Sequence, residues 1–170
     1  IYDMNGLTNN IVGRNLYLRG DNGIETDLTI DGTLQAYSTD APIDLFATTG
    51  TGIDTDDSLA VTTVNAGAGT IRLESTGGID LRAGDLVSSS IITLSAVGKI
   101  FGDAAANLEV KGGGSADLIV ETTDELKNIS AHISDLWVYQ AGSVTNLTLI
   151  SDTNVNVVRA TNNVSIVSDV

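Results

Sequence analysis

Residues 70–79 read TIRLESTGGI, and residues 91–100 read IITLSAVGKI. In both segments an I-x-L strand leads through four or five small residues and a glycine to a second isoleucine. Residues 42–53 repeat this pattern a third time, from PIDL to the isoleucine of a Thr-Gly-Ile sequence. Because apolar side chains two positions apart lie on the same face of a strand, each segment predicts two short strands with one buried face.

The same alternation extends over the whole chain and divides it into six groups. The first strands of these groups begin at positions 16, 43, 71, 92, 118 and 147, so the interval from one start to the next stays in the twenties. Such a period with three short strands is typical of a β-solenoid. We therefore expect one all-β domain over residues 1–170, a three-sided parallel β-helix of about six coils of 21–29 residues. An antiparallel sandwich is the alternative, but it does not explain why successive blocks are similar.

Helix signals are nearly absent from the chain. Asp outnumbers Glu by 17 to 5, and the 18 glycines fall mostly between short apolar runs, a composition that favours turns over helices. The one helix-like stretch, residues 122–131, is interpreted as a loop or a deformed strand. The expected core consists of stacked aliphatic columns containing Leu73, Ile79, Leu94, Ile100 and Leu108.

The charge of the chain excludes several classes of function. Eight Lys and Arg residues stand against 22 Asp and Glu residues, which gives a net charge of −14. Such a surface argues against binding to nucleic-acid phosphates and to anionic membranes. The chain has no cysteine and one histidine, and no apolar run approaches the ~20 residues of a membrane span. No cluster of paired acids and bases indicates an active site, so we expect no enzyme and no required cofactor.

The repeats resemble those of filamentous-haemagglutinin-like exoproteins. The resemblance rests on the I-x-L-x-A/S-x-G-G-I-x-L pattern, followed by L-x-V, and is clearest from about residue 43 to residue 110. Those exoproteins are large, secreted, right-handed β-helical proteins of bacterial surfaces. The resemblance implies a right-handed coil, an extracellular or cell-surface location, and an adhesive or scaffolding role.

The ends of the sequence predict how this role is carried out. The chain ends at residues 163–170, NVSIVSDV, within an alternating strand pattern, and no pattern of a capping helix is present. Open solenoid ends expose unpaired backbone groups, which another strand can satisfy. We interpret the chain as a segment of a longer protein or one subunit of a filament. The expected partners are copies of itself or further coils of the parent chain, arranged head to tail.

Four aspartates are candidate ligands of a cation: Asp54, Asp56, Asp57 and Asp80. If the isoleucines that precede Asp54 and Asp80 lie on equivalent strands, the two carboxylates stack on the outside and repel each other. A calcium ion could neutralise them, since calcium prefers oxygen ligands. In the alternative, Arg82 pairs with Asp56 and water screens the remaining charge. Asp44 and Arg72 occupy equivalent outward positions of adjacent coils, which predicts an ion pair across the strands.

Two aromatic residues are candidates for contact with a ligand or partner. Leu136 and Val138 fit the inward pattern, which places Trp137 and Tyr139 side by side on the outside. There they could stack on a sugar or pack against another chain. In the opposite register Trp137 is a core residue. These residues favour the alternative function, a carbohydrate-binding or polysaccharide-degrading β-helix whose partner is a surface polysaccharide.

Three asparagines stand in N-x-S/T sequons, the acceptor pattern for glycosylation: Asn128, Asn146 and Asn163. With 13 Asn residues and 34 Ser and Thr residues in 170, chance alone predicts about 2.6 such sequons. The three sequons are therefore no evidence that the chain is glycosylated.

Overall fold

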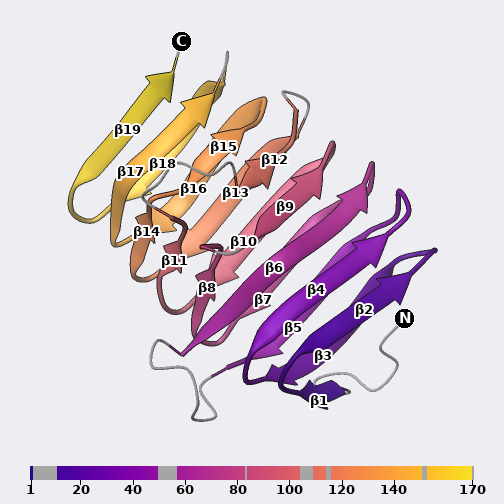
Figure 1. Ribbon diagram of the computed structural model, residues 1–170. Coiled ribbons are helices and arrows are strands. Elements are labelled where there is room, and N and C mark those ends of the chain that lie inside the picture. Colours follow the sequence, from indigo (N-terminus) through magenta and orange to yellow (C-terminus); the bar gives the residue numbers. More distant parts are fainter. Residues whose placement is uncertain are drawn as a thin grey trace.

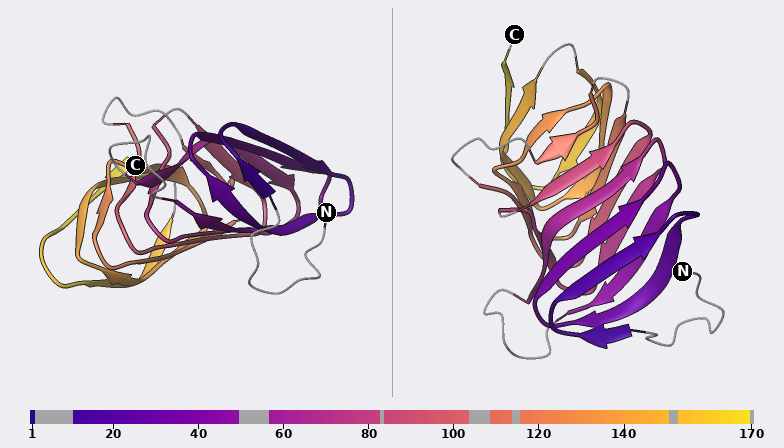
Figure 2. Two further views of the ribbon diagram at one scale, coloured as in Figure 1. Left: turned by 90° about the horizontal axis from the view of Figure 1, so that it is seen from below. Right: turned by 45° about the vertical axis from the view of Figure 1, so that its right-hand side comes forward.

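The computed structural model describes residues 1, 11–49, 57–82, 84–103, 109–113, 116–150 and 153–169. These residues form a β-solenoid of about seven turns in which all strand pairings are parallel (Figure 1). They include no helix, and so none that could cross a membrane. Figure 2 shows the N-terminal coils in indigo and the C-terminal coils in yellow at opposite ends of the stack.

The strands form two sheets on either side of the core. The first sheet contains β1 (Ile11–Gly13), β3 (Ile24–Ile30), β5 (Ile43–Thr48), β7 (Ile71–Ser75), β10 (Ile91–Ala96), β13 (Asp117–Thr122), β16 (Asp135–Ala141) and β18 (Asn154–Ala160). The second contains β2 (Leu16–Gly20), β4 (Thr33–Ser38), β6 (Ser58–Gly67), β8 (Gly78–Asp80), β9 (Asp85–Ser88), β11 (Ile100–Phe101), β12 (Val110–Lys111), β14 (Glu125–Lys127), β15 (Ser130–His132), β17 (Ser143–Ile150) and β19 (Val164–Asp169).

The number of strands per coil changes along the stack. The first residues of β6 pair with β8 and its last residues pair with β9, so the second sheet divides into two narrow strips at this point. The strips rejoin where β14 and β15 both pair with β17. The three coils in between have the expected three strands each, whereas the coils toward both ends have two strands each.

The register of the first sheet confirms three of the predicted steps and corrects two. Ile43, Ile71, Ile92 and Leu118 are successive partners, as the predicted strand starts require. The groups that begin at positions 16 and 147 were assigned to the wrong sheet, because these residues lie in β2 and β17 of the second sheet. The partner of Leu118 is instead Leu136, so this coil is shorter than any of the predicted ones. The alternation of apolar residues does not indicate to which of the two sheets a strand belongs. The strands of a two-stranded coil are therefore easily misread as part of a three-stranded coil.

The core is the expected set of aliphatic columns. Leu73 and Leu94 are direct partners and are fully buried. Ile79 and Ile100 form the corresponding pair in the second sheet and are also fully buried. Leu108 lies outside the described residues. The segment that resembles a helix in the sequence forms the two short strands β14 and β15.

Candidate functional site

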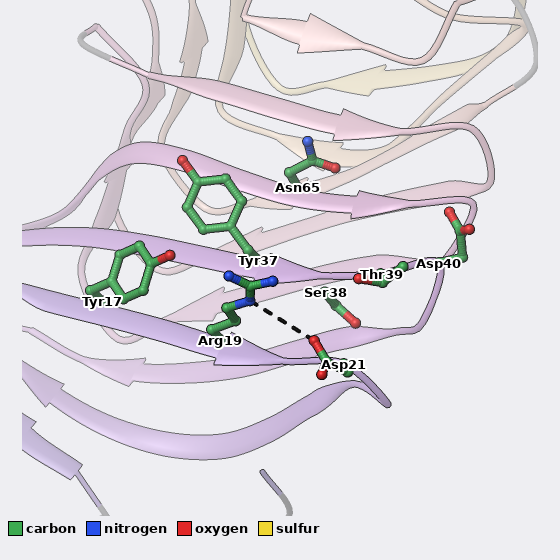
Figure 3. Close-up of a pocket in the computed structure, with 8 residues that line it drawn as sticks. All are labelled: Tyr17, Arg19, Asp21, Tyr37, Ser38, Thr39, Asp40 and Asn65. Carbon is green, nitrogen blue, oxygen red and sulfur yellow. Dashed lines mark ion pairs between the residues drawn. The ribbon is translucent and has the colours of Figure 1, made fainter.

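A cleft on the outer face of the second sheet gathers side chains from β2, β4 and β6, and we call it the tyrosine cleft (Figure 3). The register aligns Arg19 with Tyr37 and Tyr37 with Asn65, which gives an outward column across three coils. Tyr17 lies two residues before Arg19 and therefore on the same face, diagonal to Tyr37. The β-helix thus brings together residues that are up to 48 positions apart in the sequence.

The tyrosine cleft has the size of a small-ligand site. Its volume is about 410 Å³, and its lining consists of Tyr17, Arg19, Asp21, Tyr37, Ser38, Thr39, Asp40 and Asn65. The two tyrosine ring centroids lie 5.7 Å apart, with the ring planes inclined by 40°. The rings form a bent apolar surface whose edges carry polar groups (Figure 3).

Two turns fix the polar groups at one end of the cleft. Asp40 adopts a left-handed conformation with φ of 55°, and its Oδ1 accepts a hydrogen bond of 2.9 Å from the backbone N–H of Ala68. Asn65 Oδ1 accepts a bond of 2.9 Å from the N–H of Gly67. These bonds engage the oxygen of the Asn65 amide and one oxygen of the Asp40 carboxylate. Because their positions are set by the backbone, the two side chains are held in place before any ligand arrives.

The remaining polar groups of the cleft have weaker interactions with the rest of the protein. The Arg19 guanidinium lies 3.9 Å from the Asp21 carboxylate, and both side chains are exposed. Ser38 Oγ is a buried atom with no hydrogen-bond partner, the single such side-chain atom among the described residues. A buried hydroxyl without a partner is unfavourable by ~1–3 kcal/mol unless water or a ligand satisfies it.

Sequence analysis does not identify the tyrosine cleft, although a signal for it exists. Leu16 in β2 pairs with Leu34 in β4, so the coil between them is also shorter than any of the predicted ones. The predicted first coil runs from position 16 to position 42 and contains no strand over residues 33–38, so it separates Tyr17 from Tyr37. A search that also allowed shorter periods would bring the two tyrosines onto neighbouring strands.

The aspartate candidates are arranged differently from the expectation. Asp54 and Asp56 lie outside the described residues, and Asp57 is exposed. The ladder neighbours of Asp80 are Ala60 and Phe101, so the expected stacking of Asp54 on Asp80 is wrong. In the described part of the chain, no three acidic or imidazole side chains lie close enough together to hold a metal ion. Calcium binding stays a prediction.

The Asp80 carboxylate is held by an arginine of its own coil. Arg82 Nε lies 3.0 Å from Asp80 Oδ1, Arg82 Nη2 lies 2.7 Å from Oδ2, and the Arg82 backbone N–H also donates to Oδ1. The guanidinium lies over the Phe101 ring at 4.7 Å from its centroid. On the first sheet, Arg72 Nη1 in β7 lies 3.4 Å from Asp44 Oδ2 in β5 of the preceding coil, which confirms the predicted ion pair across the strands.

A second cleft of about 410 Å³ lies beside Arg82 and Phe101. Two lysines, Lys99 and Lys127, also line it. The Lys127 ammonium lies 3.9 Å from Glu125, and the Asp124 carboxylate contributes to the same lining. Opposite charges are thus mixed along this cleft, so its charges alone do not select one class of ligand.

The predicted aromatic pair faces outward. Leu136 and Val138 are fully buried, Trp137 is half-buried and Tyr139 is exposed. The Trp137 and Tyr139 rings stack with centroids 6.1 Å apart and planes inclined by 27°. The structure therefore has the outward register, and contact with a ligand or partner at these residues stays a prediction.

Two of the sequon asparagines have a structural role. Asn128 and Asn146 both adopt φ of 53°, a conformation that asparagine tolerates better than most residues. Asn146 Nδ2 donates a hydrogen bond of 3.1 Å to Asn128 Oδ1 on the neighbouring coil. Asn163 is exposed just before β19. This hydrogen bond between neighbouring coils gives the two asparagines a structural role that requires no glycan.

The carboxyl group of Glu109 is buried inside the solenoid. Glu109 is fully buried and accepts hydrogen bonds from the backbone N–H groups of Asp103, at 3.0 Å, and Ser130, at 2.9 Å. Burial raises the pKa of Glu109 above its ordinary value, although the backbone donors act in the opposite direction. The group joins two coils and lies away from the tyrosine cleft lining.

The C-terminal coil exposes residues that belong to core columns. Val155 follows Leu136 in the ladder and Val164 follows Val144. Leu136 and Val144 are fully buried, whereas Val155 and Val164 are 48% and 51% exposed. The last described coil thus presents half-covered apolar columns at the end of the stack.

Comparisons with known proteins find no match to this chain among protein families, curated proteins or solved structures.

Proposed function

We propose that this chain is a structural segment of an extracellular β-helical filament, sheath or adhesin stalk, in which coils associate end to end. The observation that carries the proposal is the exposure of Val155 and Val164 at the end of columns that are elsewhere fully buried. A further coil placed against β18 and β19 would bury these side chains. It would also pair the outer N–H and C=O groups of the two strands.

The sides of the solenoid support a structural role. Charged side chains on the sides pair with neighbours in their own or the adjacent coil: Arg72 with Asp44, Arg82 with Asp80, and Lys111 with Asp85. Such pairs reduce the repulsion between like charges stacked along a ladder. The proposed role is non-enzymatic, and the resemblance of the repeats to secreted exoproteins supports a location outside the cell.

The proposal predicts that the isolated chain associates through this end. Sedimentation velocity over a range of protein concentrations, with negative-stain imaging of the samples, should show linear species that lengthen with concentration. Val164→Lys should shift this association to higher concentration, because a buried ammonium without a partner is strongly unfavourable.

A matched variant distinguishes the end from the sides. Val97 is 61% exposed on the flank, between β10 and β11, so Val97→Lys adds the same charge at a comparably exposed valine. This control should associate like the unmodified chain. A chain that remains monomeric at high concentration, or one that associates equally well with either lysine, contradicts end-to-end association.

A further inference from the structure

We propose that the tyrosine cleft is a carbohydrate-binding site that accepts a neutral sugar ring of a glycan. The site lies on the outer face of the second sheet, over β2, β4 and β6, whereas the proposed association surface is formed by β18 and β19. The inference therefore goes beyond the structural role and does not depend on it.

The apolar part of a sugar-binding site is present. One face of a pyranose ring carries mainly C–H groups, which pack against aromatic rings. Tyr17 is 60% exposed, although a large aromatic side chain usually gains free energy from burial. The Tyr17 and Tyr37 rings lie next to each other in the cleft, with their planes inclined by 40°, and together offer an aromatic surface to a ring-shaped ligand (Figure 3).

The polar part of the cleft matches hydroxyl groups. A sugar hydroxyl both donates and accepts hydrogen bonds, so its site must supply both kinds of partner. Asp21 and Asp40 supply acceptors, and Arg19 and the Asn65 amide nitrogen supply donors. The turn bonds to Asp40 and Asn65 hold these two groups rigidly, which lowers the entropic cost of binding.

The charge of the cleft selects the class of sugar. The lining contains one guanidinium and two carboxylates, and the chain as a whole carries a net charge of −14. An acidic or sulfated sugar would be repelled by this field, whereas a neutral hexose would not. The cleft volume of about 410 Å³ accommodates a small number of sugar rings at most.

The Trp137–Tyr139 pair is the other aromatic candidate, and it has a different geometry. The two rings stack with their planes inclined by only 27°. The pair belongs to β16 on the first sheet, across the core from the tyrosine cleft. The control is therefore taken from neither aromatic site: Val97 is an exposed apolar residue outside the tyrosine cleft.

The test is a titration of the purified chain with sugars of defined charge. Linear hexasaccharides of glucose, mannose and galactose serve as neutral probes, and hexagalacturonate is the charged counterpart of the galactose probe. Isothermal titration calorimetry should detect saturable binding of at least one neutral probe and weaker binding of hexagalacturonate. Raising the salt concentration should leave the neutral affinity nearly unchanged, because no net charge is neutralised on binding.

Three variants locate the binding. Tyr17→Ala should weaken the affinity for the neutral probe about tenfold, through loss of the stacking surface. Tyr37→Phe keeps the ring and removes only the hydroxyl, so it should have a smaller effect. Val97→Ala, which shortens an exposed apolar side chain outside the cleft, should bind like the unmodified chain. Thermal melting of each variant shows whether the fold is retained, and the high exposure of Tyr17 leads us to expect that it is.

Three results would overturn the inference. These are an absence of saturable binding by every neutral probe at millimolar concentration, tighter binding of hexagalacturonate than of its neutral counterpart, and equal losses of affinity in Tyr17→Ala and Val97→Ala. None of these results bears on end-to-end association, which is measured by sedimentation without any sugar.

Discussion

Leu94 occupies the middle of a column that runs through the first sheet. Its ladder neighbours are Leu73 on one side and Val120 on the other, and all three side chains are fully buried. Because close-packed neighbours relax only partly, removing this side chain leaves a cavity between two coils.

Leu94→Ala should therefore lower the free energy of unfolding by ~2–5 kcal/mol. The adjacent Thr93 points outward and is only half-buried, so Thr93→Ala should cost much less and serves as the control. Chemical denaturation of the two variants measures both values. Equal losses at the two positions would mean that Leu94 is not part of a packed column.

Glu109 makes stability depend on pH in a direction that is unusual for a carboxyl group. Its pKa is raised by burial, so the fold favours the protonated form. The stability contributed by such a group is complete below the pKa of the unfolded chain and is lost as pH rises through the raised pKa of the folded chain. From mildly acidic to neutral pH, the contribution of Glu109 to the free energy of unfolding should therefore decrease progressively.

Glu109→Gln removes this titration while it keeps a similar shape. We expect the melting temperature of the unmodified chain, relative to that of Glu109→Gln, to fall as pH rises from about 4.5 to 7.5. The comparison with the variant cancels the effect of the other carboxylates. A relative melting temperature that rises over this range would contradict the raised pKa.

Residue patterns predicted the contacts that follow from strand alternation and missed those that depend on turns. The Leu73–Leu94 contact and the Asp44–Arg72 pair follow from alternation and a coil step, both of which are visible in the sequence. The pairing of Arg82 with Asp80, two residues before it, depends on how the chain turns after β8. The alternation pattern contains no information about that turn.

At the level of strands, the division of β6 explains why the coil length was predictable only in the middle of the chain. Between β7 and β13, glycines and small residues separate three strands per coil, and the predicted steps are correct. In the N-terminal coils β3 runs unbroken through seven residues, Ile24–Ile30, so no corner interrupts the alternation there. Continuous alternation across a predicted corner is the signal that indicates two strands per coil.

The end of β6 depends on a glycine. Gly67 has φ of +56°, and a Cβ atom there would lie 2.2 Å from Asp40 Oδ1, the atom that accepts the hydrogen bond from Ala68. Gly67→Ala would thus combine an unfavourable backbone conformation with displacement of a side chain that lines the tyrosine cleft. The conformation alone costs ~1–2 kcal/mol, and the lost hydrogen bond adds ~0.5–1.5 kcal/mol.

Gly113→Ala separates these two contributions. Gly113 has φ of +64°, but a Cβ atom there meets nothing within 4 Å. The free energy of unfolding, measured by chemical denaturation, should fall further in Gly67→Ala than in Gly113→Ala. An equal decrease in both variants would show that the contact with Asp40 contributes nothing.

For the whole molecule, the ladder of parallel strands and the net charge have opposite effects on association. The terminal coil offers half-covered apolar columns, so contact between ends is favoured by burial of Val155 and Val164. Each chain also carries a net charge of −14, so two chains that approach repel each other. The balance between these terms sets the concentration at which chains associate.

Salt should therefore promote association of this chain. The screening length falls from ~10 Å at 0.1 M salt to ~3 Å at 1 M, which weakens repulsion between the acidic surfaces. Burial of apolar side chains does not depend on that screening, so it persists at high salt. We expect sedimentation velocity to show longer species as sodium chloride is raised at constant protein concentration, and Val164→Lys to remain less associated than Val97→Lys in every buffer. Dissociation on adding salt would show that ion pairs, rather than the exposed core columns, join the chains.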